Sequence, residues 1–221
     1  GPRNMHWNYS MGGRHLKEVT EEKGLGVIIT NDLKVEAQCS AACVKANRML
    51  GLIKRTLVNK RRAILTTLYK SLVRPHLEYS TAAWSPHYVK DREMLERVQR
   101  RFTRMVPGLG ELEYGERLGV LGLMTLEERR NRSDMVEMYK VLKGLSAIPR
   151  ETFFELNGNG RTRGNSMKIV KKVVQTDIRK YFFSQRVISK WNGLDERVVS
   201  AETVDTFEKR LHKDCEKKMG L

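Results

Sequence analysis

Residues 54–74 read K-R-T-L-V-N-K-R-R-A-I-L-T-T-L-Y-K-S-L-V-R, and residues 91–105 read D-R-E-M-L-E-R-V-Q-R-R-F-T-R-M. In both stretches apolar residues recur every three or four positions, which is typical of a helix with one buried face. Many of the remaining positions carry arginine or lysine. The two stretches therefore predict a helical domain with a strongly basic surface.

The helix predicted over residues 91–105 carries four arginines at the spacing i, i+3, i+4 and i+7: Arg97, Arg100, Arg101 and Arg104. Like charges on one helix face destabilise an isolated helix by roughly 0.2–0.5 kcal/mol per pair. A bound phosphate backbone would relieve this repulsion. The alternative is a solvated face whose charge is partly balanced by Asp91, Glu93 and Glu96.

A second basic cluster lies where the preceding helix is predicted to begin. Asn59 is the predicted N-cap, so that the first turn holds Lys60, Arg61 and Arg62. Cations at a helix N-terminus oppose the helix dipole, and a bound anion is a reason for their presence. This helix is predicted to end near Arg74, because Pro75 follows.

The other patterns place a small β part before these helices and a second module after them. Gly12-Gly13 predicts the turn of a hairpin, and the β-branched run at 24–30 predicts a further strand. Near the C-terminus we expect a strand over 167–176 and a helix over 177–191. The fold class is mainly α: a helical bundle with a small N-terminal β-hairpin or sheet remnant and a smaller α+β C-terminal part. The expected ranges are 4–33 for the β remnant, 34–145 for the helical domain, 146–167 for a flexible linker and 168–221 for the C-terminal module.

The charge balance favours a polyanionic partner. The chain of 221 residues has 42 Lys and Arg against 26 Asp and Glu, a formal charge of +16, and its isoelectric point is near 9.9. Such an excess favours nucleic acid or another anionic surface, with a generally basic surface as the alternative. The candidate nucleic-acid contacts are Lys54, Arg55, Lys60, Arg61, Arg62, Arg97, Arg100, Arg101, Arg104, Arg129, Arg130, Arg132, Arg161, Arg163, Lys168, Lys171, Lys172, Arg179 and Lys180.

Several other classes of protein are disfavoured. The three cysteines form no disulfide framework or zinc spacing, and no apolar run is long enough for a membrane span. No signal-peptide pattern is present, so we expect an intracellular protein of the nucleus or cytoplasm. The five histidines are scattered, no nucleophile elbow occurs, and the paired aspartates of polymerases are missing. We therefore expect no cofactor, no metal and no catalysis by this chain alone.

Three segments of the chain resemble the region that follows the polymerase core in reverse transcriptases of non-LTR retrotransposons, the jockey-like LINE elements. The first segment comprises K-S-L-V-R-P-H-L-E-Y at 70–79, A-A-W-S-P at 82–86 and L-E-R-V-Q-R-R-F-T-R at 95–104. The second is L-G-L-M-T-L-E-E-R-R-N-R-S-D at 121–134, and the third is Y-F-F-S-Q-R-V-I-S-K-W-N-G-L at 181–194. E-E-K-G-L-G-V-I-I at 21–29 is similar to a strand of the same family. Gly24 and Asp195 depart from the family pattern, which has Asp and Pro at these positions.

The resemblance implies that residues 4–33 end the palm-side sheet and that 34–145 form the thumb. In this family the thumb would contact the template–primer duplex, and the C-terminal part would hold element RNA or target DNA. The catalytic aspartates would lie upstream of this chain. We therefore expect a non-catalytic nucleic-acid-binding module of an RNA-directed DNA polymerase, with RNA, DNA and hybrid left open. The alternative is a domesticated derivative that acts as a protein-interaction module.

Overall fold

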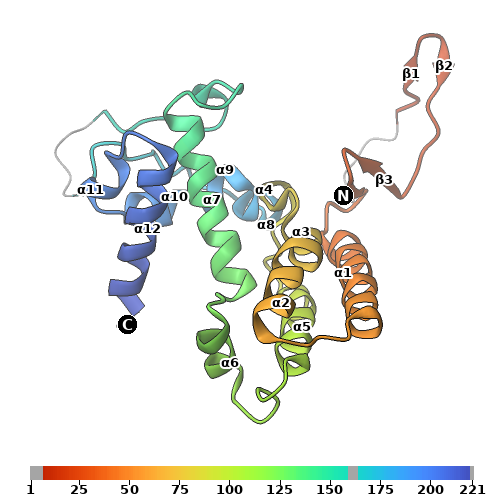
Figure 1. The fold of residues 1–221 in the computed structure, drawn as a ribbon. Coiled ribbons are helices and arrows are strands. Elements are labelled where there is room, and N and C mark those ends of the chain that lie inside the picture. The colour runs from red at the N-terminus through yellow and green to blue at the C-terminus, as the bar shows by residue number, and fades with distance from the viewer. Residues whose placement is uncertain (1–6, 159–163, 220–221) are drawn as a thin grey trace. The chain divides into compact units, whose positions relative to one another are not determined.

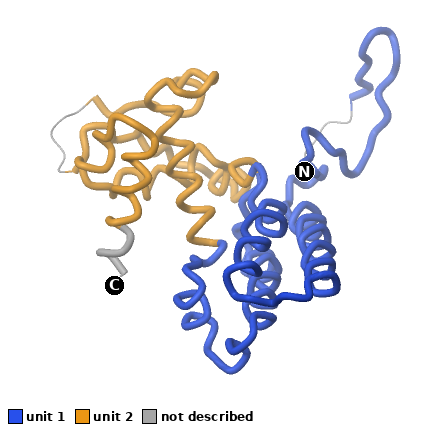
Figure 2. Tube along the Cα trace, in the orientation of Figure 1, with its two compact units in different colours: residues 1–80, 84–126 blue, residues 81–83, 127–221 orange. Residues whose placement is uncertain are grey.

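A computed structural model describes residues 7–158 and 164–219, with side chains described up to residue 214. The fold is mainly helical, as predicted (Figure 1). The chain divides into two compact units (Figure 2). Unit 1 comprises residues 1–80 and 84–126, and unit 2 comprises residues 81–83 and 127–221. No helix in the described ranges has the length and apolar character that a bilayer span requires.

The N-terminal part of unit 1 forms two antiparallel hairpins. Strands β1 (Ser10–Met11) and β2 (Arg14–His15) pair around Gly12-Gly13, whose positive φ angles of 58° and 77° suit a tight hairpin turn. The predicted hairpin is confirmed. Strands β3 (Glu21–Gly24) and β4 (Val27–Thr30) form the second pair, so Gly24 ends one strand instead of opening the next.

The rest of unit 1 is helical. Its buried residues form one core, in which Tyr69 stacks on Phe102 with ring centroids 4.1 Å apart. A hydrogen bond of 2.9 Å from the Ile28 amide to the Gln38 side chain joins β4 to the first helix. The helical segments are α1 (Glu36–Thr56), α2 (Arg62–Leu68), the π-helix η1 (Tyr69–Val73), α3 (Arg74–Glu78), α5 (Val89–Met105) and α6 (Tyr114–Leu121).

Two predicted boundaries in unit 1 are wrong. The Asn59 side chain accepts a hydrogen bond of 3.2 Å from the Arg61 amide, and α2 begins only at Arg62. Lys60 and Arg61 therefore precede the helix. The chain remains helical through Pro75, because this residue lies in the first turn of α3. A proline in the first turn of a helix costs no backbone hydrogen bond of that helix. The π-helix η1 precedes this turn and joins α2 to α3.

Unit 2 packs its helices around a second apolar core. The Tyr139 and Phe207 rings stack at 4.4 Å, and Trp191 lies 6.0 Å from Phe207. Residues 81–83 come from the short helix α4 (Thr81–Trp84), and the other helices are α7 (Leu126–Leu142), the 3-10 helix η2 (Arg150–Thr152), α8 (Asp177–Tyr181), α9 (Phe183–Arg186), α10 (Ile188–Asn192), α11 (Glu196–Val199) and α12 (Val204–Met219).

The strand predicted over 167–176 is also wrong. Only an isolated bridge between Leu156 and Ile169 forms there. The Asn192 side chain both accepts from the Ile169 amide and donates to the Ile169 carbonyl, each at 2.9 Å. The Asn192 side chain thus satisfies the backbone of Ile169, while Lys168 and Val170 pair with the segment around Leu156 through two backbone hydrogen bonds of 2.8 Å.

The helix predicted over 177–191 is broken into α8, α9 and α10. Phe182 adopts the extended values φ −63° and ψ 148°, and the chain turns there. This turn lets Phe183, Ile188 and Trp191 all enter the core.

The predicted helical range 34–145 is divided between the two units. After Leu126, α7 contributes Met135, Met138 and Tyr139 to the core of unit 2. The predicted linker at 146–167 falls within unit 2, where Phe154 and Asn165 are buried. The units therefore divide next to the start of α7.

Candidate nucleic-acid interface

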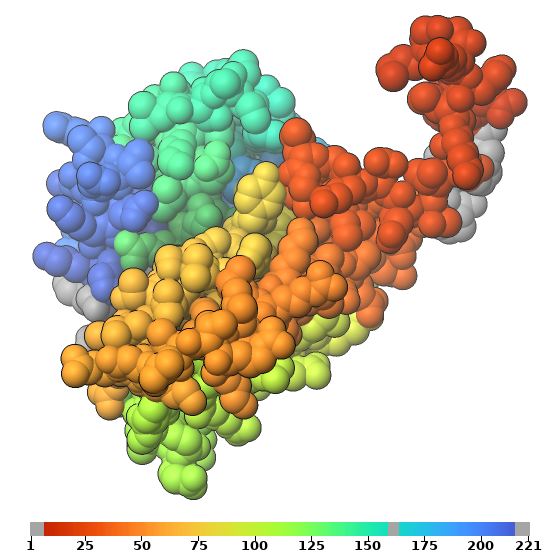
Figure 3. Space-filling model, turned by 45° about the vertical axis from the view of Figure 1, so that its right-hand side comes forward, coloured from red at the N-terminus to blue at the C-terminus, as the bar shows by residue number. Residues whose placement is uncertain are grey.

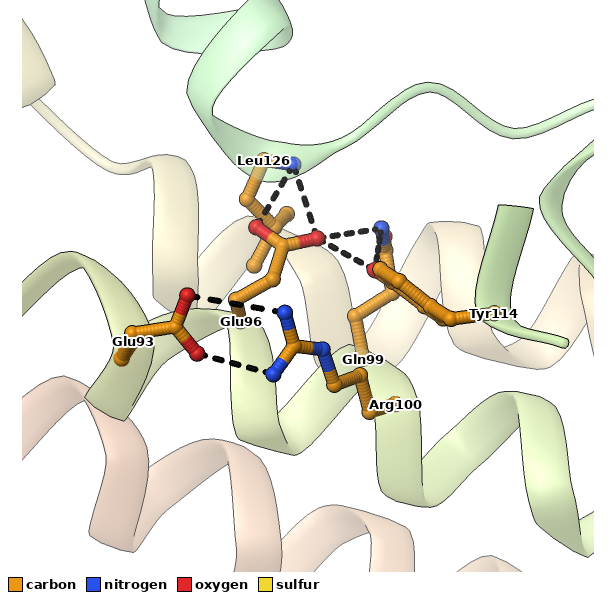
Figure 4. A network of polar contacts seen from close by, with 6 residues as sticks. All are labelled: Glu93, Glu96, Gln99, Arg100, Tyr114 and Leu126. Carbon is orange, nitrogen blue, oxygen red and sulfur yellow. Dashed lines mark hydrogen bonds and ion pairs between the residues drawn. The ribbon is translucent and has the colours of Figure 1, made fainter.

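Helix α5 is held in unit 1 by a buried polar network (Figure 4). The Glu96 carboxylate accepts hydrogen bonds from the Tyr114 hydroxyl and, at 3.0 Å, from the Leu126 amide. The Gln99 side chain donates to the Met124 carbonyl at 3.0 Å and accepts from the Tyr69 hydroxyl at 2.8 Å. One side of α5 is thereby tied to η1, to α6 and to the first residue of α7.

The network keeps the tyrosine hydroxyls protonated. Burial raises the pKa of Tyr114, and the hydrogen bond to Glu96 raises it further. Burial likewise raises the pKa of Tyr69. Both hydroxyls therefore act as hydrogen-bond donors at neutral pH.

Helix α5 lies beside α1, and three contacts advance along both helices in the same direction. Lys90 pairs with Glu36 at 2.6 Å, the Cys43 thiol donates to the Met94 carbonyl at 3.4 Å, and Arg101 donates to the Asn47 side chain at 3.4 Å. The Cys43 thiol serves packing, because burial raises its pKa to about 11 even though Arg97 lowers it.

The predicted arginine face of α5 separates into two parts. Arg97, Arg101 and Arg104 are exposed, and none of them has a carboxylate partner among the residues that the structure describes. Arg100 is different: it pairs with Glu93 at 2.8 Å and lies 5.0 Å from the centre of the Tyr114 ring. Only the other three form an open cationic face.

The second predicted cluster lies at the end of α1 and the start of α2. Lys54 and Arg55 occupy the last turn of that helix, and Lys60, Arg61 and Arg62 follow in the connection and at the start of α2. All five are exposed, and within the described ranges they form no ion pair. The orange and gold atoms of α1, this connection and α2 form one continuous face of unit 1 (Figure 3).

Three further cations, Lys45 and Arg48 of α1 and Lys70 of η1, are exposed and lie outside the predicted set of contacts. A simple signal identifies them. Residues 37–77 contain nine Lys and Arg and no Asp or Glu. Arg74 pairs with Glu78 at 3.6 Å, whereas the other eight have no carboxylate partner in the part of the chain that the structure describes.

The predicted contacts on α7 are less accessible. Arg130 is 3% exposed, so a strand on the surface does not reach its side chain. Arg132 lies 3.6 Å from the Glu208 carboxylate and donates to the Glu208 carbonyl at 3.2 Å. Arg129 is half-buried. These three arginines are therefore not part of the interface proposed below.

The predicted contacts near the C-terminus are scattered over unit 2. Lys168 is half-buried, and Lys171 donates to the Ser189 hydroxyl at 2.7 Å. Lys172 pairs with Glu155 at 2.9 Å. Two exposed cations lie over rings instead: Arg179 over Phe182 and Lys180 over Tyr181. The remaining two predicted contacts, Arg161 and Arg163, lie outside the described residues.

One residue from each of the three segments that carry the resemblance meets the others in unit 2. Arg186 forms a two-pronged ion pair with Asp134, at 2.9 and 2.8 Å. The same guanidinium donates to the Ala82 carbonyl at 2.9 Å. Arg186 thus joins residues of 82–86, 121–134 and 181–194, and its role is structural.

No metal-binding group of three or more His, Cys, Asp or Glu side chains is present among the described residues. Comparison with known proteins finds no matching family, no matching curated protein and no matching solved structure. The charge and geometry of the two units are therefore the observations that bear on function.

Proposed function

We propose that unit 1 binds the phosphate backbone of a nucleic-acid duplex through the exposed cations of residues 45–70 and of α5. One observation carries this proposal. Eight exposed cations from the acid-free stretch 37–77, together with Arg97, Arg101 and Arg104, have no carboxylate partner within the described ranges. Their mutual repulsion opposes folding, and a polyanion would remove it.

The proposed contacts are to phosphates, with little reading of base sequence. Arginine and lysine on a helical surface neutralise phosphates and release counterions, so affinity should fall steeply with salt. Contacts of this kind position a protein on a nucleic acid but carry no sequence information. RNA, DNA and hybrid duplexes are all candidate ligands.

The resemblance to LINE-type reverse transcriptases supports the same proposal. It suggests a thumb and C-terminal module of an RNA-directed DNA polymerase, or a protein derived from one. In that role the chain grips template and primer, while catalysis belongs to a separate part of the parent protein. The hydrogen bonds of Glu96 and Gln99 fix α5 within unit 1. A fixed helix suits duplex binding, because it keeps the backbone positions of its arginines constant.

The test is a charge reversal with a matched control. The variant R97E/R101E/R104E is compared with K143E/K209E/K213E, which changes three exposed cations of unit 2 and the net charge equally. Fluorescence anisotropy measures the binding of a short duplex between about 50 and 200 mM salt. We expect at least a tenfold loss of affinity for the first variant only. The slope of its salt dependence should fall by about 0.9 for each phosphate that the variant no longer neutralises.

Equal affinities of the two variants would contradict the proposal. If both bind the duplex as the unmodified chain does, the arginines of α5 are not the contact face. A role in protein interaction, as in a domesticated derivative, would then be favoured.

A further inference from the structure

Unit 2 contains an open groove of about 380 Å³, separate from the cationic face of unit 1. It lies between η2, the bridged segments around Leu156 and Ile169, and residues of α8, α9 and α10. Its lining includes two aromatic rings, three aliphatic side chains, a side-chain amide and five charged residues, among them Phe153, Phe154, Ile188, Gln185 and Arg179.

The aromatic part of the groove is rigid. The Phe154 and Phe183 rings meet edge to face at 6.1 Å, and Phe153 meets Phe183 in the same way at 6.3 Å. Hydrogen bonds of 2.8 Å hold the two bridged segments together on either side of Leu156. Phe154 is buried, whereas Phe153 is partly exposed, so Phe153 has ring surface available to a ligand.

Among the charged residues that line the groove, one cation forms no ion pair within the described part of the chain. Arg150 pairs with Glu151 at 2.7 Å, and Lys172 pairs with Glu155 at 2.9 Å. Arg179 has no carboxylate partner among the described residues, and its guanidinium lies 5.8 Å from the centre of the Phe182 ring. The ring and the guanidinium together favour a ligand with an anionic group.

The Gln185 amide adds a polar group of a particular kind. The backbone amide of Gln185 donates to the Phe182 carbonyl at 2.9 Å, whereas its side-chain amide has no hydrogen-bond partner within the described ranges. An amide carries a donor and an acceptor side by side, and such a pair matches the edge of a nucleobase. The aromatic ring, the amide and the guanidinium thus offer three kinds of contact to one small molecule.

We propose that this groove binds one unpaired nucleotide. The base stacks on Phe153, its edge bonds to the Gln185 amide, and the phosphate pairs with Arg179. Stacking on an aromatic ring tolerates any base, so the site takes single-stranded nucleic acid without strong sequence preference. An acidic peptide would also satisfy Arg179 and the Gln185 amide, but it would stack on Phe153 only if it carried an aromatic side chain, whereas every nucleotide carries a base that can stack. The chain's net charge of +16 further favours a nucleic-acid ligand.

The test uses NMR spectra of the full chain with labelled methyl groups, in which Ile188 reports on the groove. The probes are adenosine 5′-monophosphate, adenosine, inorganic phosphate and N-acetylphenylalanine. We expect the nucleotide to shift the Ile188 signal saturably and to bind at least tenfold more tightly than each other probe. F153L should reduce nucleotide binding to the level of phosphate, and R179Q should reduce it to the level of adenosine.

Three controls make the outcome interpretable. Unchanged methyl dispersion in F153L and R179Q excludes misfolding, and the conservative variant R179K should recover part of the phosphate contribution. R97E/R101E/R104E should bind the nucleotide normally, which separates this site from duplex binding by unit 1. The proposal is overturned if the nucleotide causes no saturable shift, if F153L binds it as the unmodified chain does, or if N-acetylphenylalanine binds more tightly.

Discussion

Asp91 is a buried carboxylate next to the basic surface of α5. Its side chain is 1% exposed, and within the described part of the chain its Oδ1 atom has no hydrogen-bond partner. Burial raises the pKa of this carboxyl group; Lys90 and His87 oppose the rise, and Glu36 adds to it. The charged form is therefore held at a cost in the folded chain.

We predict that Asp91→Asn stabilises the protein at neutral pH. Because the pKa is raised in the folded state, that state holds more protons than the unfolded chain at pH values between the two pKa values. Stability therefore falls as the pH rises through this window. The amide avoids this loss, and the free energy of unfolding at pH 7 should increase by about 1 kcal/mol. The gain should vanish below about pH 4, near the pKa of an unfolded Asp.

Urea denaturation of both proteins between these pH values measures the effect. Asp205→Asn, at an exposed position, serves as the control and should change little. A loss of stability in Asp91→Asn at pH 7 would mean that the carboxylate's attraction to the N-terminus of α5 outweighs its burial.

At the scale of elements, α5 organises unit 1 through two different carboxylates. Glu96 is 7% exposed and accepts from the Leu126 amide and the Tyr114 hydroxyl. Glu93 lies one turn earlier and makes a half-exposed pair with Arg100. The spacing of the two residues in sequence does not distinguish them, but their burial does.

We predict that Glu96→Ala is much more destabilising than Glu93→Ala. The first change leaves the buried Leu126 amide and the partly buried Tyr114 hydroxyl without their acceptor, which costs about 2–3 kcal/mol. The second removes a partly solvated ion pair worth roughly 0–1 kcal/mol. Chemical denaturation followed by circular dichroism measures both. Similar losses in the two variants would show that the hydrogen bonds accepted by Glu96 contribute no more to the stability of unit 1 than the Glu93–Arg100 ion pair, which Figure 4 draws beside them.

At the scale of the molecule, each unit has its own apolar core and its own largely buried polar interactions. In unit 2 these are centred on the ion pair of Arg186 and Asp134, whose side chains are 15% and 6% exposed. The same arginine donates to the carbonyl groups of Ala82 and Tyr181. It therefore gathers three separate parts of the chain into unit 2.

We predict that Arg186→Ala unfolds unit 2 selectively. Removing one partner of a buried ion pair leaves an uncompensated charge and costs about 3–5 kcal/mol. Hydrogen exchange should accelerate in α9, α10 and α12 but not in α1. Arg186→Lys keeps the charge and should show a smaller change, because lysine lacks the two-pronged geometry. Equal acceleration in α1 would mean that the two units unfold together.

The local pattern of residues was enough to predict α5, the first hairpin and the mainly helical class. These elements follow from contacts between near neighbours: apolar residues at helical spacing, and glycines where a turn needs positive φ. Net charge likewise belongs to the composition, and the acid-free stretch 37–77 can be read without a structure.

Only the tertiary structure decided which charges remain open and where the elements end. It paired Arg100 with Glu93, buried Arg130, continued the helical course across Pro75, and replaced the expected strand after Met167 with hydrogen bonds from Asn192. Each of these outcomes depends on a partner distant in sequence or on the burial of one face. Local periodicity predicts which face of a helix is apolar and which is charged, whereas packing determines which residues of other segments each face contacts.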